Sequence, residues 1–100
     1  MSVSLIDCGQ GTFTLRGRLD LANVGEILFA GQSQFDDYED IIVDLDHADC
    51  ASTAGLALLI EWATWSAAHG KKLTYENAAS NLLALIEVNG VHKLLQVSIR

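Results

Sequence analysis

The sequence predicts an α/β fold with a mostly parallel or mixed sheet of four to five strands and three main helices. Strand-like and helical segments alternate along the chain, as they do where helices cover a parallel sheet. The apolar run Ile41–Val43 is continuous, which is typical of a strand covered on both faces. A long helical segment from about Thr53 to His69 ends at Gly70. With no proline in 100 residues, we expect a single domain over residues 1–100.

The first half of the chain is expected to contain two strands and one helix. Residues 3–8 predict a short strand, followed by a glycine-rich turn at residues 9–11. Thr12–Arg16 alternates polar and apolar residues, which predicts a strand with one solvated face; Gly17 is expected to break it and Leu19 to end it. Asp20 is the expected N-cap of the first helix. The apolar stripe of that helix comprises Val24, Ile27, Leu28, Gly31 and Phe35.

The second half is expected to contain three strands and two helices. The strand at Ile41–Val43 leads through a short acidic loop into the helix that starts near Thr53. Residues 71–75 predict the next strand. Ser80 is the expected N-cap of a third helix that ends at Asn89 and Gly90. Residues 93–99 predict a final edge strand.

Composition and charge narrow the class of partner. The formal net charge of −7 argues against nucleic acid and against an anionic lipid surface as direct ligands. The sequence shows neither a signal peptide nor an apolar run long enough to cross a bilayer, so we expect a cytoplasmic protein without direct membrane insertion. Cys8 and Cys50 are interpreted as two small buried thiols rather than as a disulfide.

Two hydroxyl side chains, Ser52 and Thr53, precede and open the long helix, with Ala54 behind them. A helix N-terminus has unpaired N–H groups and a partial positive charge. A structural role for Thr53 is that of a cap, worth about 1 kcal/mol. A functional role is an exposed hydroxyl that accepts a phosphoryl group or forms the centre of a docking surface. The sequence leaves both roles open.

The long helix is apolar on two faces. One stripe comprises Leu56, Leu59, Ile60, Ala63 and Ala67, and a second comprises Leu58, Trp62 and Trp65. Such a helix is either buried on both faces or offers one of them to a partner. Tryptophan is enriched at interface hot spots. Core and interface both remain open for Trp62, and the position of Trp65 near the solvated end of the helix favours the interface.

The sequence contains no recognisable catalytic or metal-binding set. Asp44, Asp46 and Asp49 lie at or after the carboxyl end of a strand, where α/β sheets place ligands and where carboxylates can hold Mg²⁺. We interpret them as solvated loop charges. The three histidines lack metal-ligand spacing, and Gly55 lacks the lysine of a phosphate-binding loop. The sequence therefore predicts a binding module that is not an enzyme and uses neither metal nor cofactor.

Four sequence blocks resemble the STAS domain, the fold of bacterial anti-sigma-factor antagonists and of the cytoplasmic tails of sulfate transporters. The resemblance covers about Thr12 to Leu95. It implies that the junction before the long helix docks a partner. The blocks are Phe13-x-Leu15-x-Gly17-x-Leu19-Asp20, Ile42-Val43-Asp44-Leu45, Ser52-Thr53-Ala54-Gly55-Leu56-Ala57-Leu58-Leu59 and Gly70-Lys71-x-Leu73.

Within this family, Thr53 and the segment Gly55–Trp62 look most like the small STAS subunit of the Mla phospholipid-transport ABC complex. The resemblance implies a non-catalytic cytoplasmic subunit, associated with the inner membrane through its complex. Such a subunit binds and supports the ATPase subunit of an ABC phospholipid transporter that maintains outer-membrane lipid asymmetry. The implied partner-binding residues are Ser52, Thr53, Ala54, Leu58, Trp62 and Trp65.

The alternative function is that of an anti-sigma-factor antagonist whose Thr53 is phosphorylated by an anti-sigma factor kinase. Sigma-regulating members commonly have an aspartate immediately before the phosphorylated residue. This chain has Ser52 at that position, which favours docking over phosphorylation.

Overall fold

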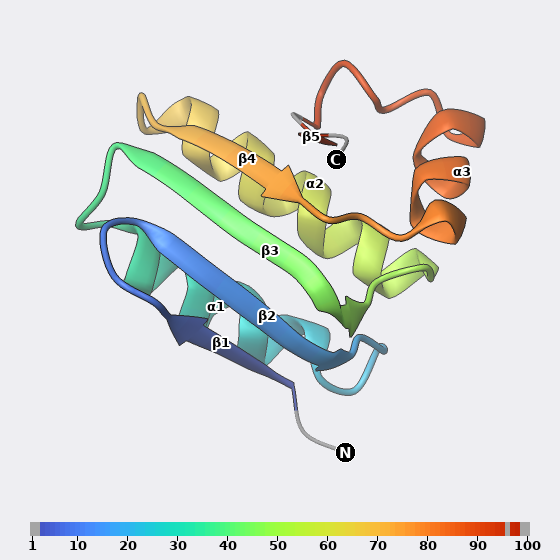
Figure 1. Cartoon of the computed structure of the whole chain (residues 1–100), viewed down its shortest axis with the longest axis horizontal. Coiled ribbons are helices and arrows are strands. Elements are labelled where there is room, and N and C mark those ends of the chain that lie inside the picture. The colour runs from blue at the N-terminus through green and yellow to red at the C-terminus, as the bar shows by residue number, and fades with distance from the viewer. Residues whose placement is uncertain (1–2, 96, 99–100) are drawn as a thin grey trace.

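The computed structural model describes residues 3–95 and 97–98. Its strands form one five-stranded sheet in the order β1-β2-β3-β4-β5 (Figure 1). The pairing of β1 with β2 is antiparallel, and the other three pairings are parallel, which confirms the predicted α/β class and mostly parallel sheet. The elements are β1 Ser4–Asp7, β2 Thr12–Arg18, α1 Val24–Phe35, β3 Asp40–Asp49, α2 Thr53–Ala68, β4 Lys72–Glu76, α3 Ser80–Val88 and β5 Val97–Ser98.

Helices α1 and α2 lie side by side on one face of the sheet, and α3 lies at the end of the sheet near the C-terminal segment (Figure 1). The core fills the layer between the sheet and the two helices. Phe35 of α1 stands edge-to-face with both Phe13 of β2 and Trp62 of α2, with ring centroids 5.1 Å apart in each pair. Tyr75 of β4 is also fully buried, and its hydroxyl donates a hydrogen bond to the Leu59 carbonyl at 2.8 Å.

Two strands continue through residues where the sequence predicted a break or a loop. Gly17 does not break β2, because glycine tolerates its φ of +105° and the strand continues to Arg18 with a register shift between Thr14 and Arg16. Strand β3 continues to Asp49, which pairs with Arg18. The segment predicted as an acidic loop is therefore mostly strand, because ladder pairing with β2 outweighs the low strand propensity of aspartate.

Two predicted caps also differ. Asp20 lies one turn before α1, and its carboxylate accepts hydrogen bonds from the backbone N–H groups of Ala22 and Asn23 at 2.8 and 3.0 Å. The N-cap position of α1 is Asn23, whose side chain makes no cap hydrogen bond. Ser80 is the first residue of α3 rather than its N-cap.

The cysteines and the C-terminal segment bring two further corrections. Cys8 is exposed while Cys50 is buried, so only one thiol matches the expectation, and both are free.

Lys93 and Leu94 lie in a turn, and β5 comprises only Val97 and Ser98. Residues 96 and 99 of the predicted strand lie outside the described residues. No helix in the described part of the chain has the length and apolar character needed to span a bilayer.

Candidate functional site

Ser52 caps helix α2. Its backbone is extended, with φ −151° and ψ 167°, and its Oγ accepts a hydrogen bond from the Gly55 N–H at 3.0 Å. The same hydroxyl donates to the carbonyl of Leu19, at the end of β2, at 3.3 Å. One side chain therefore satisfies a free N–H of the helix and links α2 to the loop between β2 and α1.

Tight packing holds this junction in place. A Cβ at Gly55 would overlap the carbonyl group of Cys50, so only glycine allows α2 to start this close to β3. The Cys50 carbonyl also accepts a hydrogen bond from the Ser52 N–H at 2.8 Å. Burial, together with the charge of Asp49, raises the pKa of the Cys50 thiol to about 12, so this thiol stays protonated at neutral pH.

Thr53 is the first residue of α2, and its side chain is exposed. Because Ser52 performs the capping, the Thr53 hydroxyl is not needed for it. Among the described residues, no hydrogen bond partner of this hydroxyl is found. The structural role considered for Thr53, that of the cap, is therefore filled by Ser52, and the Thr53 hydroxyl stands free at the positive end of the helix.

A shallow cavity of about 480 Å³ lies where this junction meets the β2–α1 loop. Leu21 stands at its rim and is 86% exposed, which is unusual for a large apolar side chain. Arg18 is also exposed and faces the Asp49 carboxylate at 3.9 Å. The lining residues are Arg18, Leu19, Asp20, Leu21, Ser52, Thr53 and Ala54.

Of the residues predicted to bind a partner, the structure brings Ser52, Thr53 and Ala54 together in the lining of this cavity. Leu58 and Trp62 are 1% and 0% exposed, so the surface stripe suggested for them does not form. The reason is the neighbouring helix: Trp62 donates from Nε1 to the Leu28 carbonyl of α1 at 3.1 Å. Gly31 of α1 lies so close that a Cβ there would overlap the indole ring.

Trp65 occupies an intermediate position at the end of the same stripe. It is half-buried and lies against Phe35, with ring centroids 6.4 Å apart. Its outer side stacks on the His69 ring at 4.4 Å. The His69 Nδ1 lies 2.7 Å from the Trp65 carbonyl oxygen. Trp65 therefore has both a core face and a solvent-facing edge.

The described residues, the acidic ones of β3 included, contain no group of three or more potential ligands placed to hold a metal ion. Asp44 is tied to its neighbours instead. Partial desolvation acts to raise its pKa, but hydrogen bonds from Asn77 Nδ2 and from the Asp46 N–H outweigh this effect and hold the pKa below its usual value.

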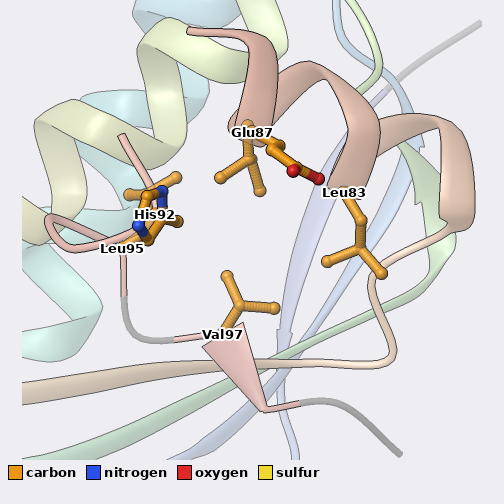
Figure 2. A pocket seen from close by; sticks show the side chains of 6 residues that line it. Leu83, Glu87, His92, Leu95 and Val97 are labelled. Carbon is orange, nitrogen blue, oxygen red and sulfur yellow. The ribbon is translucent and has the colours of Figure 1, made fainter. Parts of the chain in front are cut away.

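A second cavity, of about 440 Å³, lies between α3 and the segment that leads to β5 (Figure 2). Its lining is mostly apolar, with Glu87 and His92 as the polar side chains. It shares no lining residue with the junction before α2. The residues around it are Leu83, Ile86, Glu87, His92, Leu95 and Val97.

Three exposed residues were not predicted from the sequence: Arg18 and Leu21, which line the cavity at the junction, and Phe29 on α1. Phe29, on α1, is 70% exposed. One sequence signal was available for it: Phe29 directly follows Leu28 and falls outside the apolar stripe of its helix. Leu21 carried a weaker signal, as an apolar residue inside a turn immediately after Asp20.

The element order, the mostly parallel sheet with α1 and α2 on one face, and the close junction between β3 and α2 define a STAS domain. A family model described as "Mlab, STAS domain" matches residues 7–96. The chain therefore belongs to the family of MlaB-like STAS domains.

Solved structures of anti-sigma factor antagonists share the fold. The unphosphorylated form of the anti-sigma factor antagonist SpoIIAA superposes with a TM-score of 0.71 at 15% identity, over 99% of this chain and 88% of that one. An anti-sigma factor antagonist from Mycobacterium paratuberculosis gives a TM-score of 0.71 at 14% identity, over 96% of this chain and 85% of that one. A search of curated protein sequences gives no match.

Proposed function

We propose that this protein is a non-catalytic STAS subunit that binds and supports the ATPase subunit of an ABC phospholipid transporter. In this proposal it acts in the cytoplasm, and it reaches the inner membrane only through that complex. The transporter it serves maintains lipid asymmetry in the outer membrane. The match to the MlaB-like family over residues 7–96 supports this partner over other partners of STAS domains.

One structural observation carries the proposal. Ser52 fulfils the capping role at α2, which leaves the neighbouring Thr53 hydroxyl exposed at the helix end. A polar group without a structural role, placed beside the 86% exposed Leu21, suits a docking surface that combines an apolar anchor with a hydrogen-bonding group. Hydrogen bonds and close packing hold both sides of the junction in place, so binding would require little reordering.

The test introduces a charge at Thr53. Thr53→Glu puts a carboxylate at the positive end of α2, which the folded domain tolerates. In a docked complex the same carboxylate would have to lose its water, which costs several kcal/mol unless the partner supplies a cation. We expect the variant to fold with an unchanged melting temperature, to lose the ATPase in co-purification from the native cell, and to leave a defective outer-membrane lipid barrier.

Thr64→Glu is the matched control, because Thr64 is an exposed threonine on the outer side of the same helix. It should co-purify with the ATPase as the unmodified protein does. A Thr53→Glu variant that retains the ATPase at normal stoichiometry would remove Thr53 from the interface. If the unmodified protein itself captures no ABC ATPase, the proposed function is wrong.

A second function rests on the same hydroxyl. An exposed threonine at a helix N-terminus is a favourable place for a phosphoryl group, and the fold is that of anti-sigma factor antagonists. An antagonist switched by phosphorylation of Thr53 would capture a small kinase-like anti-sigma factor in the same co-purification. Mass spectrometry of the captured partner therefore separates the two functions.

A further inference from the structure

Gly25 in the first turn of α1 has no role inside the domain that requires glycine. A Cβ at this position would meet nothing within 4 Å, and its φ is not in the left-handed region. Glycine is nevertheless less favourable than alanine in a helix. Gly31, six residues later, is different, since the Trp62 indole fills the space beside it. The open space at Gly25 therefore faces outward.

Two exposed apolar side chains flank this open space. Leu21 is 86% exposed and Phe29 is 70% exposed, four residues before and four residues after Gly25. Leu21 lies in the turn that leads into α1, and this turn is closed by a hydrogen bond from the Val24 N–H to the Asp20 carbonyl at 3.1 Å. Residues four apart lie on the same side of a helix. Gly25 and Phe29 therefore lie on the same side of α1, and Leu21 stands in the turn before the helix. These three exposed residues, with the gap at Gly25 between two apolar side chains, are here called the α1 ridge.

We infer that the α1 ridge is a second contact surface for the ATPase partner, and that a helix of that partner crosses α1 at Gly25. A glycine at the crossing point lets two backbones approach closely, while the side chains before and after it pack around the crossing helix. Aromatic side chains such as Phe29 are enriched in the buried centre of interfaces. This inference rests on the proposed function and extends its docking site.

Charge selects the kind of helix that fits. Glu26 is the charged residue within α1, and Asp20 adds a second exposed carboxylate at the end of the ridge. The nearby Arg18 already faces Asp49. The crossing helix is therefore apolar at its centre and carries lysine or arginine at its flanks. Self-association would bring these carboxylates together, and an anionic membrane would repel them in a chain of net charge −7.

The ridge is continuous with the junction before α2. Leu21 belongs to the ridge and also lines the cavity that contains Thr53. A single partner that covers Thr53 therefore reaches Leu21, and the next exposed apolar side chain along α1 is Phe29. The two surfaces form one interface rather than two separate sites.

The experiment is a size series at position 25. Gly25→Ala and Gly25→Leu are purified and their melting temperatures are measured, and their affinity for the purified ATPase subunit is determined by biolayer interferometry. We expect both variants to melt at or above the temperature of the unmodified domain. Affinity should fall with side-chain size, by about tenfold or more for Gly25→Leu. Ala68→Leu, which adds similar bulk to an exposed position at the far end of α2, should bind normally.

Three outcomes would overturn the inference while leaving the proposed function intact. The first is a Gly25→Leu variant that binds the ATPase as tightly as the unmodified domain. The second is a dimer of the free domain in sedimentation analysis that Gly25→Leu abolishes. The third is binding to phosphatidylglycerol vesicles that depends on Phe29. If the unmodified domain binds no ATPase, the failure lies with the proposed function instead.

Discussion

Helices α1 and α2 lie next to each other on the same face of the sheet, yet they differ in how much of their large apolar side chains they expose. The more apolar helix is α2, and its large side chains Leu58, Leu59 and Trp62 are all buried. The less apolar α1 carries Phe29 at 70% exposure, with Leu21 at 86% in the turn before it. The exposed apolar surface is therefore not on the more hydrophobic of the two helices.

The difference shows that the neighbours of a helix decide which of its faces is free. Helix α2 has two apolar stripes because one faces the sheet, where the Tyr75 hydroxyl bonds to its Leu59 carbonyl, and the other faces α1, where Trp62 meets Gly31. Helix α1 needs only one stripe for these contacts. Its remaining large apolar residue, Phe29, stays 70% exposed in the described part of the chain, so it is the better indication of an interface.

The largest expected effect is a difference in folding stability between two truncations, one of an aromatic residue on each helix. Trp62→Ala should destabilise the domain by about 3–5 kcal/mol, because it leaves a cavity in the core and removes the hydrogen bond to the Leu28 carbonyl. Phe29→Ala should change stability by less than about 0.5 kcal/mol. Denaturant unfolding followed by circular dichroism measures both. Similar losses of stability in the two variants would contradict the division between buried α2 and exposed α1.

The next largest effect concerns Trp65, which is neither fully buried like Trp62 nor largely exposed like Phe29. Trp65→Ala should cost about 1–2 kcal/mol of folding stability, less than a fully buried tryptophan, because only one face packs against Phe35. If its outer edge contacts the partner, the folded variant should also lose about 2 kcal/mol or more of binding energy for the ATPase.

His69→Ala is the control for Trp65, since it removes the stacked ring and leaves the indole in place. That variant should keep most of the stability and the binding. A Trp65→Ala variant that fails to fold would identify Trp65 as a core residue and extend the buried stripe to the end of α2.

The smallest expected effects come from removing each of the two hydroxyl groups at the junction in turn. Ser52→Ala should cost about 1 kcal/mol, because it removes the cap of α2. Thr53→Ala should leave stability within about 0.5 kcal/mol and weaken partner binding instead. Paired thermal melts and affinity measurements distinguish them. Equal losses of stability would mean that Thr53 has a structural role that the hydrogen bonds of the junction do not reveal.

Element order and the position of α2 could be predicted because they depend on local signals. The continuous run at Ile41–Val43 is strand β3, and α2 begins at Thr53 and ends before Gly70, whose φ is +69°. Strand ends could not be predicted in the same way. Asp44 and Asp49 belong to β3 because β2 provides a pairing partner along that length, and this pairing is a contact between distant segments.

Part of the candidate site could be predicted because that part also depends on local signals. Ser52, Thr53 and Ala54 are adjacent in sequence, so the junction could be located from one segment and from its family resemblance. Leu21 joins it through contacts between distant segments, among them the hydrogen bonds from Ser52 Oγ to the Leu19 carbonyl and from the Leu19 N–H to the Asp49 carbonyl. The burial of Trp62 depends on Gly31 of another helix, and no pattern within α2 contains that information.

The hydrogen bond from Ser52 to Leu19 also bears on the rates of association and dissociation. It couples the loop that carries Leu21 to the start of α2, so the free domain presents both contact groups in one fixed arrangement. Loss of that link would lower the fraction of molecules ready to bind, which slows the formation of the complex. Loss of a contact such as Phe29 would mainly shorten the lifetime of the complex once it has formed.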